Sequence, residues 1–162
     1  MIRPVISIIM GSQSDLETVK EAIGLLKEFK VGFEVKVLSA HRSPTELAEY
    51  VEEAPQKGRK VFIAAAGGAA ALAGVIAAYT TLPVIGIPIE TKNLKGLDSL
   101  LSTVQMPRGI PVASMAIGRA GARNAALFAL EILGISDKKI QLKLRAYKKK
   151  MRLEFKKIKL KL

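Results

Sequence analysis

The only histidine of the 162-residue chain, His41, stands beside an arginine in the stretch SAHRSP. An imidazole titrates near neutral pH, so it can take up or release a proton during a reaction. The planar guanidinium of Arg42 keeps its charge and suits a phosphate or a carboxylate. A lone histidine is more often structural than catalytic, but an anion-binding neighbour favours the catalytic interpretation.

A second stretch with chemical potential is GSQSD, which begins at Gly11. Ser12 and Ser14 precede a predicted helix, and the N–H groups and dipole at such a turn favour an anion, typically a phosphate. The carboxylate of Asp15 suits the hydroxyls of a ribose. An alternative is that Ser14 is an ordinary N-cap with Glu17 completing a capping box, and both interpretations can hold together. The glycine spacing is neither a dinucleotide-binding fingerprint nor a P-loop.

A third stretch, GGAAALAG, opens with Gly67 and Gly68 and continues into a predicted helix from about Ala69. Glycine lets the backbone approach a ligand closely. The alternative is plain packing of small residues between a helix and a sheet, which this stretch alone favours.

Short β-rich runs alternate with helical patterns along the chain and must position these stretches. Pro44 and Ser43 are predicted to be the first residue and the cap of the second helix. Buried strands that alternate with helices indicate a three-layer α/β fold with a doubly wound parallel sheet, in which ligands bind at the carboxyl ends of the strands. His41 and the glycine stretches follow strands and therefore share that edge. The predicted strands are 5–10, 33–39, 61–66, 83–89 and 111–117, and the helices are 14–29, 44–57, about 69–80, 96–103 and 119–133.

The composition fits one folded domain, with 49% hydrophobic and 25% charged residues. The absence of cysteine excludes disulfides and thiolate metal sites, and one histidine with unclustered acids predicts no metal. The uncharged run 61–89 is interrupted by Pro83 and Pro88, so two buried strands and a helix are a better interpretation than a membrane span. The apolar run before GSQSD is too short for a signal peptide, which predicts a cytoplasmic protein.

The net charge of +12 is concentrated at the C-terminus, because residues 138–162 carry 12 Lys and Arg and a single acid. We therefore expect a catalytic domain over residues 1–137 and a basic amphipathic helix over residues 138–162. A basic helix with an apolar stripe packs on a neighbouring subunit more often than it binds RNA, so neither nucleic acid nor a membrane is the expected partner. The stripe consists of Ile140, Leu144, Tyr147, Met151, Phe155, Ile158 and Leu162.

Five motifs in order resemble one family. MGSQSD, SAHRSP, AAAGGAA, GLDSLLSTVQMPRGIPV (96–112) and AIGRAGARNAA (116–126) are similar to the 5-(carboxyamino)imidazole ribonucleotide mutases of purine biosynthesis, in older usage the catalytic subunit of phosphoribosylaminoimidazole carboxylase. The resemblance covers about residues 5–134. It implies a flavodoxin-like fold, a homo-octamer, and neither a metal nor an organic cofactor.

The resemblance also implies a reaction in which a carboxyl group moves from the exocyclic nitrogen of an aminoimidazole ribonucleotide to the adjacent ring carbon. In that reaction His41 is the proton shuttle, while Ser12, Asp15 and Arg42 bind the ribonucleotide. One departure is the glycine loop, usually GGAAHLPG in the family, where this chain has Ala71 and Ala73. The remaining residues expected to bind substrate are Gly11, Ser14, Ser39, Ala40, Gly67, Gly68 and Ala69.

Two other functions remain open at this point. One is direct carboxylation of aminoimidazole ribonucleotide by carbon dioxide, because the related carboxylases differ from the mutases in this same glycine loop. The other is a non-catalytic nucleotide- or RNA-binding protein, which would explain the glycine turns or the basic tail but not His41 beside Arg42.

Overall fold

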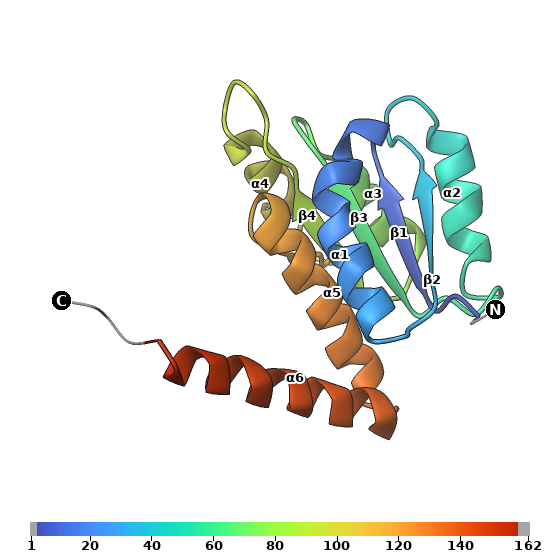
Figure 1. The fold of residues 1–162 in the computed structure, drawn as a ribbon. Helices are drawn as coiled ribbons and strands as arrows, with labels where there is room; N and C mark the ends of the chain where they lie inside the picture. Colours follow the sequence, from blue (N-terminus) through green and yellow to red (C-terminus); the bar gives the residue numbers. More distant parts are fainter. Residues whose placement is uncertain (1–2, 159–162) are drawn as a thin grey trace. The chain divides into compact units, whose positions relative to one another are not determined.

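A parallel sheet forms the centre of the chain up to Ala129, the first of two compact units in the computed structural model, which describes residues 3–158. The strand order is β2-β1-β3-β4-β5, and each pair is parallel (Figure 1). This order is that of flavodoxin-like proteins and confirms the predicted doubly wound α/β fold. The strands are β1 (Ile6–Met10), β2 (Phe33–Val37), β3 (Val61–Ala66), β4 (Val84–Pro88) and β5 (Ala113–Ser114).

Helices cover both faces of this sheet. On one face α2 and α3 pack against buried residues of β1, β3 and β4, as Leu47 and Ile76 do around Phe62. On the other face lies α1, which crosses in front of the strands in Figure 1. Strands buried on both faces explain the apolar run of β4 and that of β1, which only Ser7 interrupts. The elements are η1 (Gln13–Asp15), α1 (Leu16–Glu28), α2 (Pro44–Glu53), α3 (Leu72–Tyr79), α4 (Leu97–Val104) and α5 (Gly118–Gly134).

The strand order places a switch point between β1 and β3. The chain passes from β1 to its neighbour β2 on one side, and then crosses to β3 on the other side of β1. In such sheets the connections after the two strands diverge and leave a crevice at their carboxyl ends. GSQSD follows β1 and the glycine stretch follows β3, so both border this crevice.

Several elements are shorter than predicted, the fifth strand most of all. The fifth strand was expected over 111–117 but comprises two residues, because Pro111 has no N–H and the chain already turns toward α5. At that turn a Cβ on Gly121 would lie 1.6 Å from the Ala116 carbonyl oxygen, so only glycine fits. The second helix was expected to reach residue 57 but ends at Glu53, since Pro55 lacks the N–H that would continue it.

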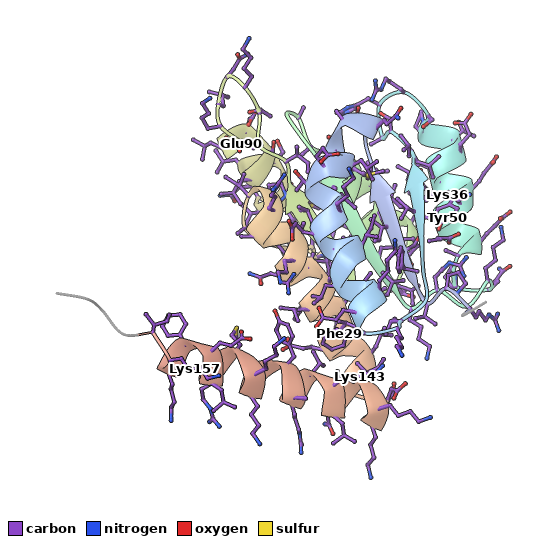
Figure 2. All side chains as sticks on the ribbon, viewed as in Figure 1. Phe29, Lys36, Tyr50, Glu90, Lys143 and Lys157 are labelled. Atoms are coloured by element: carbon purple, nitrogen blue, oxygen red, sulfur yellow. The ribbon has the colours of Figure 1, made fainter. Side chains whose placement is uncertain are left out.

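A polar cluster fastens the edge strand β2 to its neighbours. The Tyr50 hydroxyl donates to the Glu34 carboxylate and shares a hydrogen bond with Ser7, while Arg59 pairs with the same carboxylate. Lys36 lies over the Tyr50 ring, 5.7 Å from its centroid (Figure 2). Burial and the Glu34 carboxylate raise the pKa of Tyr50 to about 12.

The second unit, from Leu130 onward, contains the end of α5 and the helix α6 (Lys138–Lys156). Asp137 caps α6, since its side chain accepts hydrogen bonds from the N–H groups of Lys139 and Ile140. Of the predicted apolar stripe, Leu144 is buried, Ile140 and Tyr147 are half-buried, and Met151, Phe155 and Ile158 are exposed, while Leu162 lies outside the described residues. Within residues 3–158 no helix has both the length and the apolar content needed to cross a membrane.

Candidate active site

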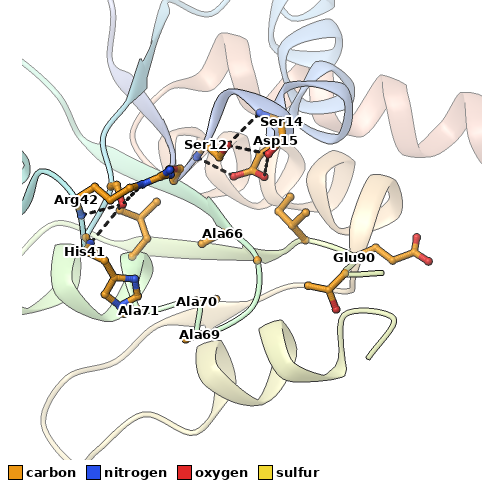
Figure 3. Close-up of a pocket in the computed structure, with 17 residues that line it drawn as sticks. Ser12, Ser14, Asp15, His41, Arg42, Ala66, Ala69, Ala70, Ala71 and Glu90 are labelled. Carbon is orange, nitrogen blue, oxygen red and sulfur yellow. Dashed lines mark hydrogen bonds between the residues drawn. The ribbon is translucent and has the colours of Figure 1, made fainter. Parts of the chain in front are cut away.

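A cavity of about 560 Å³ opens at the carboxyl ends of β1, β2, β3 and β4 (Figure 3). Of the eleven residues predicted for the site, ten line it. They come from three separate connections, those after β1, β2 and β3, which the strand order brings together. The ten are Gly11, Ser12, Ser14, Asp15, Ser39, Ala40, His41, Arg42, Gly67 and Ala69.

Gly68 is the predicted residue that does not line the cavity. Its φ of 68° lies in the left-handed region that favours glycine. Its N–H donates to the Ser99 hydroxyl at 3.0 Å. Gly68 therefore sets the conformation of the glycine loop on the side away from the cavity.

The GSQSD turn contains a capping box, but two residues earlier than predicted. The Ser12 hydroxyl accepts a hydrogen bond from the Ser14 N–H, and the Asp15 carboxylate accepts one from the Ser12 N–H. The prediction of Ser14 as N-cap with Glu17 is wrong because the 3-10 turn η1 precedes α1. Glu17 instead pairs with Lys20.

Asp15 is the buried carboxylate of this turn, with 6% of its surface exposed. Burial raises its pKa, while the hydrogen bonds from Ser12 and Ser14 and the positive charge of Arg42 act in the opposite direction. Each carboxylate oxygen can accept two hydrogen bonds, and each Asp15 oxygen accepts one here, from the Ser12 N–H or the Ser14 hydroxyl. Asp15 therefore holds the turn and still has capacity to accept a bond from a ligand hydroxyl at the cavity.

The Ser39 hydroxyl organises the loop that carries His41 and Arg42. It accepts hydrogen bonds from the N–H groups of both residues, at 3.3 and 3.2 Å, and from Arg42 Nε at 3.4 Å. Arg42 Nη2 donates to the Gly11 carbonyl at 2.8 Å, which joins this loop to GSQSD. The His41 side chain is exposed and points into the cavity (Figure 3).

Ser43 and Pro44 stand at the N-cap and the first position of α2, as predicted, but the Ser43 side chain does not cap the helix. Its hydroxyl instead accepts a hydrogen bond from the Ser39 N–H at 2.9 Å. The two serines thus bracket the His41 loop from its start and its end.

Seven further residues line the cavity that were not among the predicted site residues, although Ala71 was noted as a departure from the family's glycine loop. Three of them directly follow β4, so the expectation that ligands bind at the carboxyl ends of the strands also pointed to them. The other four flank the glycine turn and carry only aliphatic side chains, which by themselves indicate no chemistry. The seven are Ala66, Ala70, Ala71, Leu72, Ile89, Glu90 and Thr91.

The cavity thus combines an exposed imidazole, a guanidinium, a buried carboxylate and serine hydroxyls against a wall of methyl groups. Residues 3–158 contain no cluster of three or more histidine and acidic side chains that could hold a metal ion. This set of groups suits proton transfer on an anionic, hydroxyl-bearing small molecule.

Comparison with known proteins agrees with this chemistry. A family model described as AIR carboxylase matches residues 5–154. N5-carboxyaminoimidazole ribonucleotide mutase of Pyrococcus horikoshii is 56% identical over 150 residues, which cover 93% of this chain and 84% of that protein. The mutase of Saccharolobus solfataricus is 52% identical over 149 residues, covering 92% and 93%, and that of Bacillus subtilis 55% over 143 residues, covering 88% of each.

A solved structure, the crystal structure of Treponema denticola PurE, superimposes with a TM-score of 0.86. It is 27% identical and covers 94% of both chains. Since the family model spans nearly the whole chain and the relatives are more than half identical, the chain belongs to the AIR carboxylase family.

Proposed function

We propose that the cavity binds an imidazole ribonucleotide and that His41 moves the proton in its conversion. The chain transfers the carboxyl group of 5-(carboxyamino)imidazole ribonucleotide to the ring carbon, giving 4-carboxy-5-aminoimidazole ribonucleotide. This is an isomerisation in de novo purine biosynthesis. The observation that carries the assignment is the sole imidazole of the chain in a cavity lined by ten predicted residues, in a chain 52–56% identical to mutases.

The reaction moves one proton as well as one carboxyl group. The bond between the exocyclic nitrogen and the carboxyl carbon breaks, and carbon dioxide stays in the cavity while the ring carbon forms a new bond to it. The ring carbon then loses its proton and the nitrogen gains one, so a single group that accepts and returns a proton completes the cycle. His41 serves this role, and such help is typically worth about 10²–10⁴ in rate, roughly 3–5 kcal/mol.

The binding roles follow from the groups along the wall. Arg42 is a fixed cation that faces an anion, and Ser12 and Ser14 supply hydroxyls in the turn where a phosphate is expected. Asp15 accepts hydrogen bonds from the ribose. Support comes from the hydrogen bond between Arg42 and Gly11, which holds the cation beside that turn.

Ala71 stands where the family usually has histidine, in the loop in which mutases and direct carboxylases differ. An experiment on the source of the carboxyl group therefore tests the proposed reaction most directly. One coupled assay compares 5-(carboxyamino)imidazole ribonucleotide with aminoimidazole ribonucleotide plus bicarbonate as substrates. Rapid turnover of the carboxyamino compound is expected. Turnover only with the bicarbonate mixture would replace the mutase by a direct carboxylase.

We further propose a cytoplasmic homo-octamer, with residues 1–137 as catalytic domain and residues 138–162 as a helical extension. Support comes from apolar side chains that remain exposed in one chain. Near α4 the exposed fractions are 57% for Leu94, 53% for Leu97, 48% for Leu101 and 49% for Val104. Large apolar side chains left exposed close together in the sequence are typical of a protein interface.

A further inference from the structure

Helix α4 buries two hydroxyl groups although none of its residues lines the cavity. Ser99 is completely buried and Thr103 is 3% exposed. Buried hydroxyl groups are nearly always hydrogen-bonded, since an unsatisfied one costs free energy. The Thr103 hydroxyl donates to the Ser99 carbonyl one turn back at 2.7 Å, so its bond stays within the helix.

The Ser99 hydroxyl leaves its helix and joins two connections that form the cavity wall. It donates to the Ile89 carbonyl at 2.7 Å and accepts from the Gly68 N–H at 3.0 Å. Ile89 follows β4 and lines the cavity, whereas Gly68 lies behind the turn after β3. The Ser99 side chain therefore links these two segments from inside the helix. The backbone bond from the Ile89 N–H to the Ala66 carbonyl and the exposed Ser102 hydroxyl, which donates to the Gly68 carbonyl at 3.4 Å, add to this link.

The start of α4 is built so that Ser99 can reach them. Gly96 precedes the helix with a φ of 88°, and a Cβ there would lie 2.7 Å from Ile117 and 3.2 Å from the backbone of Glu90. The Thr91 hydroxyl also donates to the Asp98 carboxylate at 2.8 Å and accepts from the Gly96 N–H at 3.2 Å. These contacts hold the helix directly against the cavity segment that follows β4.

The turn that Ser99 holds carries the methyl-lined wall. After Gly68 the backbone makes two tight turns, in which Ala70 N–H donates to the Gly68 carbonyl and Ala71 N–H to the Ala69 carbonyl. In the view of Figure 3 this segment lies where the His41 ring points. A shift of Gly68 is passed on to these residues, because the tight turns allow little independent adjustment.

We propose that Ser99 is a positioning residue for the carboxyl transfer. Its hydroxyl sets the place of the Gly68–Ala71 turn, and through it the place of the reacting carboxyl group relative to His41. The inference rests on the proposed function, because the group to be placed is the carboxyl of that reaction. Displacement of a reacting group by about 1 Å can lower a rate by about 10²-fold while binding through distant groups persists.

The test compares Ser99→Ala with Thr103→Val in the full chain. Both variants remove one buried hydroxyl from α4, and both should lower the melting temperature. Only Ser99→Ala should lower kcat for 5-(carboxyamino)imidazole ribonucleotide, by about 10- to 100-fold, with KM changed less than about threefold. Thr103→Val should keep the kcat of the wild type.

Equal kcat losses in the two variants, or a normal kcat in Ser99→Ala, would overturn the positioning role. If Ser99→Ala does not fold, Ser99→Cys is measured instead, since a thiol keeps the shape but is a weak donor. A reduced kcat is then expected, and a normal one counts against the inference. A wild type that does not turn over the carboxyamino substrate refutes the proposed function, whereas an active wild type with an unaffected Ser99 variant refutes the positioning role alone.

Discussion

At the scale of single residues, His41 offers the most direct separation of chemistry from binding. Because its side chain is exposed in the cavity and the proposed anion and ribose contacts come from other residues, His41→Asn should lose about 10²–10⁴ in turnover. Affinity for the product should remain within a few-fold of the wild type by calorimetric titration. A turnover close to normal, or a large loss of melting temperature, would contradict the role of proton shuttle.

Asp15 gives a prediction about stability and pH. Burial raises its pKa above the ordinary value of 3.8, so the folded protein holds this proton more tightly than the unfolded chain does. The resulting stability is present below pH 3.8 and is lost as the pH rises through the folded-state pKa. Asparagine does not titrate, so the stability of wild type relative to Asp15→Asn should fall across that window in urea unfolding. A difference independent of pH would contradict this.

At the scale of elements, the cluster on β2 and α2 gives a prediction about Tyr50. Tyr50→Phe leaves the buried Ser7 hydroxyl without this partner and should cost about 1–3 kcal/mol in the free energy of unfolding. The pKa of Tyr50 is about 12 in the folded protein against an ordinary value of 10.0. The stability that this shift contributes is therefore present below pH 10 and is lost as the pH rises toward 12. Phenolate absorbance appearing near pH 12 should be absent from the variant, and its persistence would assign the signal to another tyrosine.

The start of α4 gives a second prediction at this scale, with a matched glycine as control. Gly96→Ala places a Cβ at a positive φ and against Ile117, so it should cost more than about 1 kcal/mol of stability and reduce turnover. Gly24→Ala in α1 adds a Cβ with no atom within 4 Å and should stabilise by roughly 0.5–1 kcal/mol. The melting temperature of Gly96→Ala should therefore fall and that of Gly24→Ala should rise. Melting changes of the same sign would contradict the account of Gly96.

Sequence reasoning succeeded where one residue pattern had one structural outcome. The largely apolar runs of β1, β3 and β4 favoured buried strands, and their order along the chain then predicted the edge that carries His41. It failed where one local pattern allowed more than one outcome, and where the outcome depended on residues distant in the sequence. The capping box at Ser12 required knowledge of a preceding 3-10 turn, and the shortness of β5 required the Ala116–Gly121 contact. The proposed role of the Ser99 hydroxyl depends on the Ile89 carbonyl, 10 residues away, and on the Gly68 N–H, 31 residues away.

At the scale of the whole molecule, the C-terminal extension tests the proposed assembly. On α6 Phe155 is 76% exposed and Met151 52%, and burying such side chains is worth about 1.5–3 kcal/mol each. Removal of residues 138–162 should therefore lower the mass measured by light scattering or cause aggregation. A soluble octamer without these residues would show that the helix is not part of the interface. RNA-dependent retention of the full chain would favour a nucleic-acid partner instead.

The exposed imidazole in the cavity also makes the protein a convenient subject for spectroscopy. Since His41 is the only histidine among 162 residues, its ring protons give the sole imidazole resonances in a proton NMR spectrum. These signals need no assignment by mutagenesis, and they come from a side chain that lines the cavity. Ligand binding in the cavity and protonation of the proposed shuttle should therefore be observable in the unmodified protein, from one pair of lines, while the reaction runs.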